Sequence, residues 1–421
     1  MQLGIDDISF ATADRYLDLA TLAPVHGVDV DKFRIGLGQD RMSVCAADED
    51  VVTLAAAAAQ PLVESLSATE LRTIRTVLLA TESGIDQSKS AGVYVHHLLG
   101  LDAACRVVEL KQACYSGTAA LQTALALVAR NPEQRVLVIC SDVARYDLDS
   151  PGEPTQGAGA VAMIISADPR LVVIEPASGL HTADVMDFWR PNYRSTAVVD
   201  GRLSIRAYLD TLKAAWLDYQ DQGGEPFAAF DAFCYHQPFT RMAVKAHAHL
   251  TKVVGSPLDA ASAEAQVADT LQYNRVIGNS YTASMYIGLV SLLDHSERDL
   301  AGARIAFFSY GSGAVGELFA GVVRPGYREH LRTAAHRELL ERRREVDHAE
   351  YLRLYDVPNP TDGGDHPVPA QTSGPFRLAA ITGHRRVYER TAQSAVDGIA
   401  SGAASASGPA TTTATTLPAA G

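Results

Sequence analysis

The chain has 421 residues, 47% of them hydrophobic, and a formal net charge of −13 at pH 7. This length is enough for two hydrophobic cores or for one large duplicated α/β body. Because an acidic chain repels phosphate backbones, we expect no nucleic-acid partner. No run of about 18 or more apolar residues occurs, so no segment is predicted to span a membrane.

Five cysteines are scattered along the chain without a CxxC pair, so we expect no structural zinc site. The odd number of cysteines predicts free thiols in a reducing compartment. The N-terminus lacks a basic stretch followed by an apolar stretch, so it does not resemble a secretory signal. We therefore expect a cytoplasmic protein.

Apolar strands and amphipathic helices are predicted to alternate along most of the chain. The pattern predicts a strand ending at Ser83, a helix over 88–99, a strand from Cys105, a helix over 116–130 and a strand over 135–143. Continuous apolar strands between helices are typical of a sheet that is covered on both faces. The predicted fold class is therefore α/β.

Later segments add an internal similarity and a change of composition. The segments 157–161 (GAGAV) and 311–315 (GSGAV) each open an apolar strand, which suggests a duplicated α/β unit. The charged segment 328–354 has the pattern of a solvated helix, and 359–374 is rich in Pro, Gly and Asp, as loops are. From about Ser394 the chain is Ala, Ser, Thr, Gly and Pro, a composition that predicts disorder.

Cys114 is the first candidate for a catalytic residue. It directly follows a predicted strand and directly precedes a predicted helix. A thiol there faces the positive end of the helix dipole and free backbone N–H groups, which predicts a lowered pKa and a nucleophilic thiolate. A buried, inert cysteine is the alternative, and it is the better interpretation of Cys140 and Cys234, which lie inside apolar strands.

Two further candidates lie at the ends of apolar segments. His236 ends the segment FDAFCYH and precedes Gln-Pro, and Glu82 ends VLLATE. Ligands of open α/β sheets collect at the carboxyl ends of strands, where a histidine can polarise a carbonyl and a desolvated carboxylate can act as a base. A loop histidine and a carboxylate at a helix N-terminus are the alternatives.

These three positions lie within motifs that resemble those of the 3-hydroxy-3-methylglutaryl-CoA (HMG-CoA) synthases. The similarity extends in order from about Gly4 to about Tyr388, and it is greatest to the bacterial mevalonate-pathway enzymes. The motifs are ATESGIDQSK, KQACYSGTAALQ, SPGEPTQGAGAVAM, DVMDFWRPNY, VDGRLSIRAYL, FCYHQPFTRM, YNRVIGNSYTASMY and FFSYGSGAVGE.

The resemblance implies a thiolase-like fold with two duplicated halves, layered α–β–α–β–α. On this basis residues 1–168 form the half with the nucleophile, 169–393 form the half with the histidine, and 394–421 form a disordered tail. The family also implies a homodimer, an acyltransferase activity and a role in the mevalonate pathway.

The resemblance further implies a ping-pong reaction on CoA thioesters without a metal or an organic cofactor. Cys114 takes the acetyl group of acetyl-CoA, and Glu82 removes a proton from its methyl group. The carbanion attacks the ketone of acetoacetyl-CoA, to which His236 donates a hydrogen bond, and water releases HMG-CoA.

Other site residues are implied by the same motifs. The backbone N–H groups of Cys114 and Ser312 are the expected oxyanion donors. Lys245 and Arg241 lie where the family binds the CoA phosphate, although ordinary surface charge is the alternative for both. The remaining positions implied around the substrate are Asp142, Tyr146, Thr155, Asp200 and Asn279.

Three alternatives stay open at the level of the sequence. A β-branching synthase of polyketide assembly would share the three residues but act on acyl-carrier-protein thioesters; the motifs DFWRPNY and EPTQGAG favour free CoA instead. A ketoacyl synthase that decarboxylates malonyl thioesters needs no carboxylate base, so Glu82 argues against it. A non-catalytic scaffold is expected to have lost the nucleophile or the base, and both are present.

Overall fold

The computed structural model describes residues 1–357 and 359–391, so the predicted tail from Ser394 lies outside the described residues. Its central feature is a nine-stranded mixed sheet. The strands, in their order across the sheet, are β11 (Ala232–Tyr235), β12 (Arg304–Gly311), β13 (Val315–Val323), β8 (Val172–Thr182), β1 (Leu3–Thr12), β7 (Gly157–Ala167), β6 (Arg135–Ala144), β4 (Ile74–Ala80) and β5 (Arg106–Leu110).

The sheet contains the same strand pattern twice. β4 and β6 are parallel, and β7 and β1 then continue antiparallel; β11 and β12 are parallel, and β13 and β8 then continue antiparallel. The two copies meet where β1 pairs with β8 over a short ladder, Gly4 opposite Val173 and Ile5 opposite Val172. The predicted duplication of an α/β unit is confirmed.

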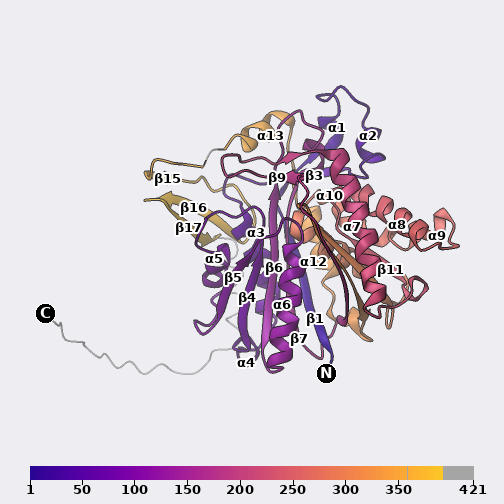
Figure 1. Ribbon diagram of the computed structural model, residues 1–421. Helices are drawn as coiled ribbons and strands as arrows, with labels where there is room; N and C mark the ends of the chain where they lie inside the picture. The colour runs from indigo at the N-terminus through magenta and orange to yellow at the C-terminus, as the bar shows by residue number, and fades with distance from the viewer. Residues whose placement is uncertain (358, 392–421) are drawn as a thin grey trace, which may run out of the picture.

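Helices cover the outer faces of both copies and also pack in the core between their inner faces (Figure 1). α6 (Ser116–Arg130) and α11 (Ser284–His295) pack in the core between the two halves of the sheet. α3 (Val51–Glu64) and α5 (Ala91–Leu98) cover the outer face of the first half, and α7 (Gly201–Asp221) and α8 (Thr240–Val253) cover that of the second. The layering α–β–α–β–α is confirmed.

Helix α6 shows how the sequence sets the central layer. Leu121, Leu125 and Val128 are buried at helical spacing on one face, and each buried leucine stabilises the fold by roughly 1.5–3 kcal/mol. Gly117 costs about 1 kcal/mol of helix propensity. A side chain there would lie 2.7 Å from the Cys140 sulfur, so glycine is required for this close packing.

One predicted element is wrong in extent. Instead of one helix over 328–354, the chain forms α12 (Thr333–Glu341), β14 (Arg344–Glu345) and α13 (His348–Tyr355). The break occurs because β14 pairs with β2 (Arg15–Asp18), while the buried Arg343 guanidinium donates to Val276 O at 3.0 Å. These tertiary contacts outweigh the helical pattern.

The other predicted boundaries agree to within a few residues. α6 and the starts of β6 and β7 fall where the sequence placed them, and α5 is shorter than the predicted helix. The segment 359–374 is irregular apart from β15 (Asp365–Pro367). The proposed boundary at 168/169 falls between β7 and β8, and the independence of the two halves as domains stays a prediction.

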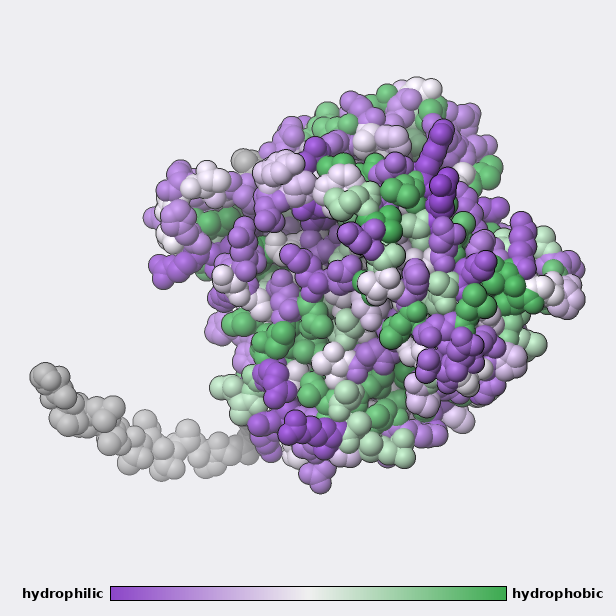
Figure 2. All heavy atoms as spheres, in the orientation of Figure 1, coloured by the Kyte–Doolittle hydropathy of each residue, from purple (hydrophilic) through white to green (hydrophobic). Residues whose placement is uncertain are grey.

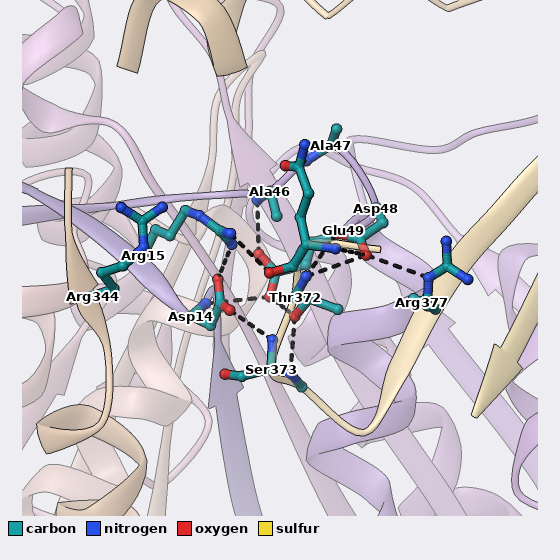
Figure 3. A network of polar contacts seen from close by, with 12 residues as sticks. Asp14, Arg15, Ala46, Ala47, Asp48, Glu49, Arg344, Thr372, Ser373 and Arg377 are labelled. Atoms are coloured by element: carbon teal, nitrogen blue, oxygen red, sulfur yellow. Dashed lines mark hydrogen bonds and ion pairs between the residues drawn. The ribbon is translucent and has the colours of Figure 1, made fainter. Parts of the chain in front are cut away.

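A small C-terminal sheet of β15, β16 (Phe376–Thr382) and β17 (Arg385–Arg390) is tied to the body by three carboxylates (Figure 3). Asp48 accepts from the Thr372 N–H at 3.0 Å, and Glu49 accepts from the Thr372 hydroxyl at 2.8 Å. Asp14 accepts from the Ser373 N–H at 2.7 Å. Asp14, Asp48 and Glu49 are called the acidic clasp below.

The face seen in Figure 2 carries hydrophilic residues interspersed with smaller hydrophobic patches. Among the helices of residues 1–357 and 359–391, none is both long enough and apolar enough to cross a bilayer.

Candidate active site

The duplicated topology brings the predicted catalytic residues to one end of the sheet. Glu82 follows β4, and His236 follows β11, the strand in the matching place of the second half. Cys114 precedes the inner helix α6, as Asn279 precedes the inner helix α11. The two halves share one core and are joined by the antiparallel strands β1 and β8, and these four positions lie at the same end of that core.

A cavity of about 900 Å³ lies at this end. Seven of the ten site residues predicted from the sequence line it, whereas Glu82, Asp142 and Lys245 do not. The seven are Cys114, Tyr146, Thr155, Asp200, His236, Asn279 and Ser312.

Cys114 and Glu82 are in direct contact. The Cys114 thiol donates to Glu82 Oε1 at 3.1 Å. Burial, with a smaller contribution from Asp142, raises the pKa of Glu82 to about 8, while Arg190 and the thiol contact act in the opposite direction. Glu82 is therefore a carboxylate that can take up or release a proton near neutral pH.

The predicted lowering of the Cys114 pKa is wrong. Burial, followed by the neighbouring Glu82 carboxylate, raises the pKa of this thiol well above its usual value. A helix dipole is worth about 0.3–1 kcal/mol at a terminus, less than one pKa unit, so it cannot offset both effects. The resting sulfur is a thiol that is hydrogen-bonded to a carboxylate.

His236 is buried and electrically neutral. Burial lowers the pKa of its imidazole to about 3. Nδ1 lies 2.7 Å from Ser284 Oγ, which also accepts from the Gln237 N–H at 3.2 Å. When the Ser284 hydroxyl donates to Nδ1, the ring hydrogen lies on Nε2, where it is available to a ligand in the cavity.

The turn that carries Ser312 lies against the Cys114 segment. Gln112 Nε2 donates to the Ser312 carbonyl at 3.3 Å. A side chain on Gly311 would lie 2.6 Å from the Gln112 carbonyl oxygen, so glycine is needed for the two turns to approach this closely. Asp187 supports the turn from the other side, accepting from the Gly313 N–H at 3.0 Å.

Asp142, expected around the substrate, lies behind the cavity wall. Its fully buried carboxylate accepts from the N–H groups of Glu82 and Ser83, each at 2.9 Å. It also accepts from the Thr282 hydroxyl at 2.5 Å and from the Thr81 hydroxyl at 2.8 Å. The structure thus gives Asp142 a positional role: it holds the turn of Glu82 against the loop before α11.

The other predicted residues divide between the wall and the rim. Asn279 N–H donates to the Thr155 carbonyl at 3.0 Å, and Tyr146 is buried in the same wall. Asp200 is an exposed N-cap of α7, accepting from the Leu203 N–H at 3.0 Å.

Basic residues on α8 lie near the same rim. Lys245 is exposed, and its ammonium lies 5.1 Å from the ring centroid of Phe239, which lines the cavity. Arg241 pairs with Glu264 at 3.4 Å.

Residues that the sequence did not single out complete the site. Phe188 lies between the rings of Tyr146 and Tyr281, at centroid distances of 6.1 and 5.7 Å. Arg190 contacts Glu82, and Asp187 contacts the Ser312 turn. The motif DVMDFWRPNY contains three of these residues, but no single position in it carried a chemical signal.

One group of side chains in the described part of the chain has the spacing of metal ligands, namely His26, Asp149 and Glu153. Hydrogen bonds already occupy it: His26 Nε2 lies 3.0 Å from Glu153 Oε2, and the Tyr351 hydroxyl donates to Glu153 Oε1 at 2.9 Å. The group is accounted for as a structural contact.

The fold and the paired thiol and carboxylate define a thiolase-like acyl-condensing enzyme. Residues 1–170 match the family described as hydroxymethylglutaryl-coenzyme A synthase N terminal, and residues 172–253 and 256–353 match its C terminal counterpart. The chain belongs to the hydroxymethylglutaryl-CoA synthase family.

Individual relatives agree with this assignment. Hydroxymethylglutaryl-CoA synthase of Enterococcus faecalis is 41% identical over 86% of this chain and 94% of its own. A crystal structure of HMG-CoA synthase complexed with CoA superposes with a TM-score of 0.87 at 40% identity, covering 93% of this chain and all of that one. The polyketide 3-hydroxy-3-methylglutaryl-ACP synthase PksG of Bacillus subtilis is 34% identical over 84% of this chain and 87% of its own.

Proposed function

We propose that this chain condenses acetyl-CoA with acetoacetyl-CoA and water, giving HMG-CoA and CoA through an acetyl group carried on Cys114. The observation that supports this most directly is the 3.1 Å contact between the Cys114 sulfur and Glu82 Oε1, beside a cavity that His236 also lines. A nucleophile, a base with a pKa near neutrality and a neutral hydrogen-bond donor are the groups that a Claisen-type condensation needs.

In the first half-reaction the Cys114 sulfur attacks the acetyl carbonyl of acetyl-CoA, and the thiol proton passes to the departing CoA sulfur. The tetrahedral oxyanion is stabilised by the backbone N–H groups of Cys114 and Ser312, whose segments are in contact. The C–S bond to CoA breaks, the CoA thiolate takes the proton, and an acetyl thioester remains on Cys114.

In the second half-reaction ionised Glu82 removes a proton from the acetyl methyl group. The carbanion attacks the ketone carbon of acetoacetyl-CoA, whose oxygen accepts a hydrogen bond from His236 Nε2. Protonated Glu82 neutralises the alkoxide, and water hydrolyses the thioester, so that HMG-CoA leaves and the thiol is restored. Asn279, Tyr146 and Thr155 are proposed to contact the substrate, since all three line the cavity.

CoA is proposed to enter from the rim, where Lys245 provides a positive charge for a phosphate in an otherwise acidic chain. Asp200 at the N-cap of α7 lies on the same rim. With the proposed activity, we place the protein in the mevalonate pathway, in the cytoplasm.

The assembly proposed is a homodimer. β5 is an edge strand of the large sheet, and Val108 on it is 41% exposed. An unpaired edge with an exposed apolar residue is a surface that a second copy of the chain can cover by strand pairing.

The test is to mix the protein with acetyl-CoA, find the acetylated residue by mass spectrometry, and then follow the loss of acetoacetyl-CoA enolate absorbance. We expect acetylation of Cys114 followed by turnover, and neither in Cys114→Ala. Turnover in that variant would remove Cys114 from the mechanism.

The carrier-protein alternative is tested in the same assay, because PksG is also a relative. Turnover with free acetyl-CoA supports the CoA-dependent function. Turnover only with acetyl-loaded acyl carrier protein would instead assign the chain to polyketide β-branching.

A further inference from the structure

Arg190 contacts Glu82 from the side opposite to the catalytic sulfur. It directly follows β9 (Phe188–Trp189), which pairs with β10 (Val198–Val199). Nη1 donates to the backbone carbonyl of Glu82 at 2.6 Å, and Nη2 lies 3.7 Å from Glu82 Oε2. The other carboxylate oxygen, Oε1, is the one that accepts from Cys114. Arg190 and Cys114 therefore face different oxygens of the same carboxylate.

Arg190 belongs to a segment that is fixed on both sides. Asp187 accepts from the Tyr310 hydroxyl at 2.8 Å and from the Gly313 N–H at 3.0 Å, which ties the segment to the Ser312 turn. The Arg190 guanidinium lies 5.8 Å from the ring centroid of Tyr281. Its side chain is 19% exposed, and that of Glu82 is 7% exposed. The contact is therefore largely shielded from water, where an ion pair is stronger than at the surface.

We propose that Arg190 is a positioning residue for the condensation, which holds the Glu82 carboxylate so that Oε1 faces the sulfur and the acetyl methyl group attached to it. This inference rests on the proposed function. Nη1 of the guanidinium fixes the backbone of Glu82 by a hydrogen bond. Nη2 restrains Oε2, the oxygen that does not react, by its charge. A planar guanidinium can donate one hydrogen bond to the carbonyl while its second nitrogen faces Oε2, whereas a lysine ammonium has a single nitrogen.

Two consequences follow from the charge and from the geometry. Asp142 raises the pKa of Glu82 and Arg190 lowers it, so removal of Arg190 takes away one of the two effects that lower this pKa and moves it further above about 8. Loss of the backbone contact also lets the carboxylate leave its aligned position. A misplaced base lowers the rate of proton transfer without preventing the acetylation of the thiol.

The experiment measures the condensation half-reaction from pre-acetylated enzyme across pH 6 to 10, in wild type, Arg190→Gln and Arg190→Lys. In Arg190→Gln we expect the pH at which the rate rises to move upward by about one unit and the plateau to fall about tenfold, so that the rate at pH 7 is about a hundredfold lower. Arg190→Lys keeps the charge but not the two-nitrogen geometry. In this variant we expect the rate to rise at nearly the same pH as in wild type and to reach a plateau about tenfold lower.

Arg145→Gln is the matched control. Arg145 and Arg190 both line a cavity of about 710 Å³, distinct from the one lined by Cys114, but Arg145 donates to the Tyr355 carbonyl and stacks on the Tyr355 ring, 4.6 Å from its centroid. Removing that charge should leave the pH profile in place. A pH profile of Arg190→Gln that coincides with that of wild type would overturn the proposal. If Arg190→Gln does not fold, a wild-type plateau rate in Arg190→Lys would overturn it.

The two levels of inference fail differently. If wild-type protein is not acetylated by acetyl-CoA, the proposed function is wrong. If wild type turns over and the Arg190 variants keep its pH profile and plateau, only the role of Arg190 is wrong.

Discussion

At the scale of single residues, burial determines the chemistry of the site. It keeps Cys114 protonated, places the pKa of Glu82 at about 8, and lowers the pKa of His236 to about 3. Burial disfavours the charged form of each group, because little water is available to solvate a charge. The hydrogen bond from Cys114 to Glu82 then holds the carboxylate beside the sulfur that is proposed to carry the acetyl group.

Glu82→Gln should keep acetylation of Cys114 and slow condensation by roughly 10²–10⁴-fold, the usual loss for a general base. Removing the carboxylate also removes one cause of the raised pKa of the Cys114 thiol, so the reactivity of Cys114 toward acetyl-CoA should not fall. Mass spectrometry measures the acetyl-enzyme, and enolate absorbance measures the second step. Failure at acetylation would contradict the role given to Glu82.

The same residue predicts the pH dependence of the wild-type protein. Glu82 accepts the methyl proton only when ionised, and its pKa of about 8 is raised by burial, so the condensation rate should rise with pH through about 8 and level above it. Glu109→Gln is the control, since Glu109 is a half-buried carboxylate on β5 that accepts from Ala91 N–H and does not line the cavity. Its profile should match wild type.

His236→Ala should raise the KM for acetoacetyl-CoA and slow condensation far more than acetylation, because in the proposed mechanism its neutral imidazole donates to the ketone in the second step only. The half-reactions are measured separately by single-turnover kinetics. His247→Gln removes another buried imidazole of low pKa, at 3.0 Å from the Tyr235 hydroxyl and outside the cavity lining, and should leave both steps nearly unchanged. Equal loss in both steps of His236→Ala would contradict the assignment.

At the scale of elements, short polar contacts decide where segments dock. β14 interrupts the helical segment 328–354 because it pairs with β2, and the acidic clasp fixes the small C-terminal sheet. Burial raises the pKa of Glu49 in the clasp to about 7, so this carboxylate depends on the donors around it. The Thr372 hydroxyl is the side-chain donor among them.

Thr372→Val should weaken this docking by about 1–2 kcal/mol, since it removes the hydroxyl that donates to Glu49 and accepts from the Gly374 N–H, and it keeps the side-chain shape. Hydrogen–deuterium exchange of β15–β17 should become about tenfold faster or more, with β6 and β7 unchanged. Ser373→Ala is the matched control, because Ser373 holds the clasp through its backbone N–H and its side chain is exposed. Equal exchange in both variants would exclude a role for the Glu49 contact.

At the scale of the whole molecule, the large sheet ends at β5 and continues through both halves to β11. The proposed dimer covers the β5 edge, which predicts that charge on this edge separates the subunits.

Val108→Lys should shift the protein from dimer to monomer in sedimentation velocity at micromolar concentration, because two lysines would face each other across a symmetric interface. Leu217→Lys is the control: Leu217 is 50% exposed on α7, which covers the other half of the sheet. A monomeric wild type, or an unaffected Val108→Lys dimer, would contradict the proposed interface.

The sequence by itself determined the α/β class, the duplicated layers and the segments that carry Cys114, Glu82 and His236. It could do so because apolar strands, helical spacing and strand-end residues are local patterns, and because the motifs around them resemble one family. Helix α6 is the clearest case, with both ends where the pattern placed them.

Only the tertiary structure decided the chemistry at these positions. The Cys114 thiol has a raised and not a lowered pKa because β4 brings Glu82 to 3.1 Å of it inside a buried site, which no local pattern records. Arg190 and Asp142 act on Glu82 from 108 and 60 residues away in the chain. Charge and burial are set by neighbours in space, and those neighbours are known only once the chain is folded.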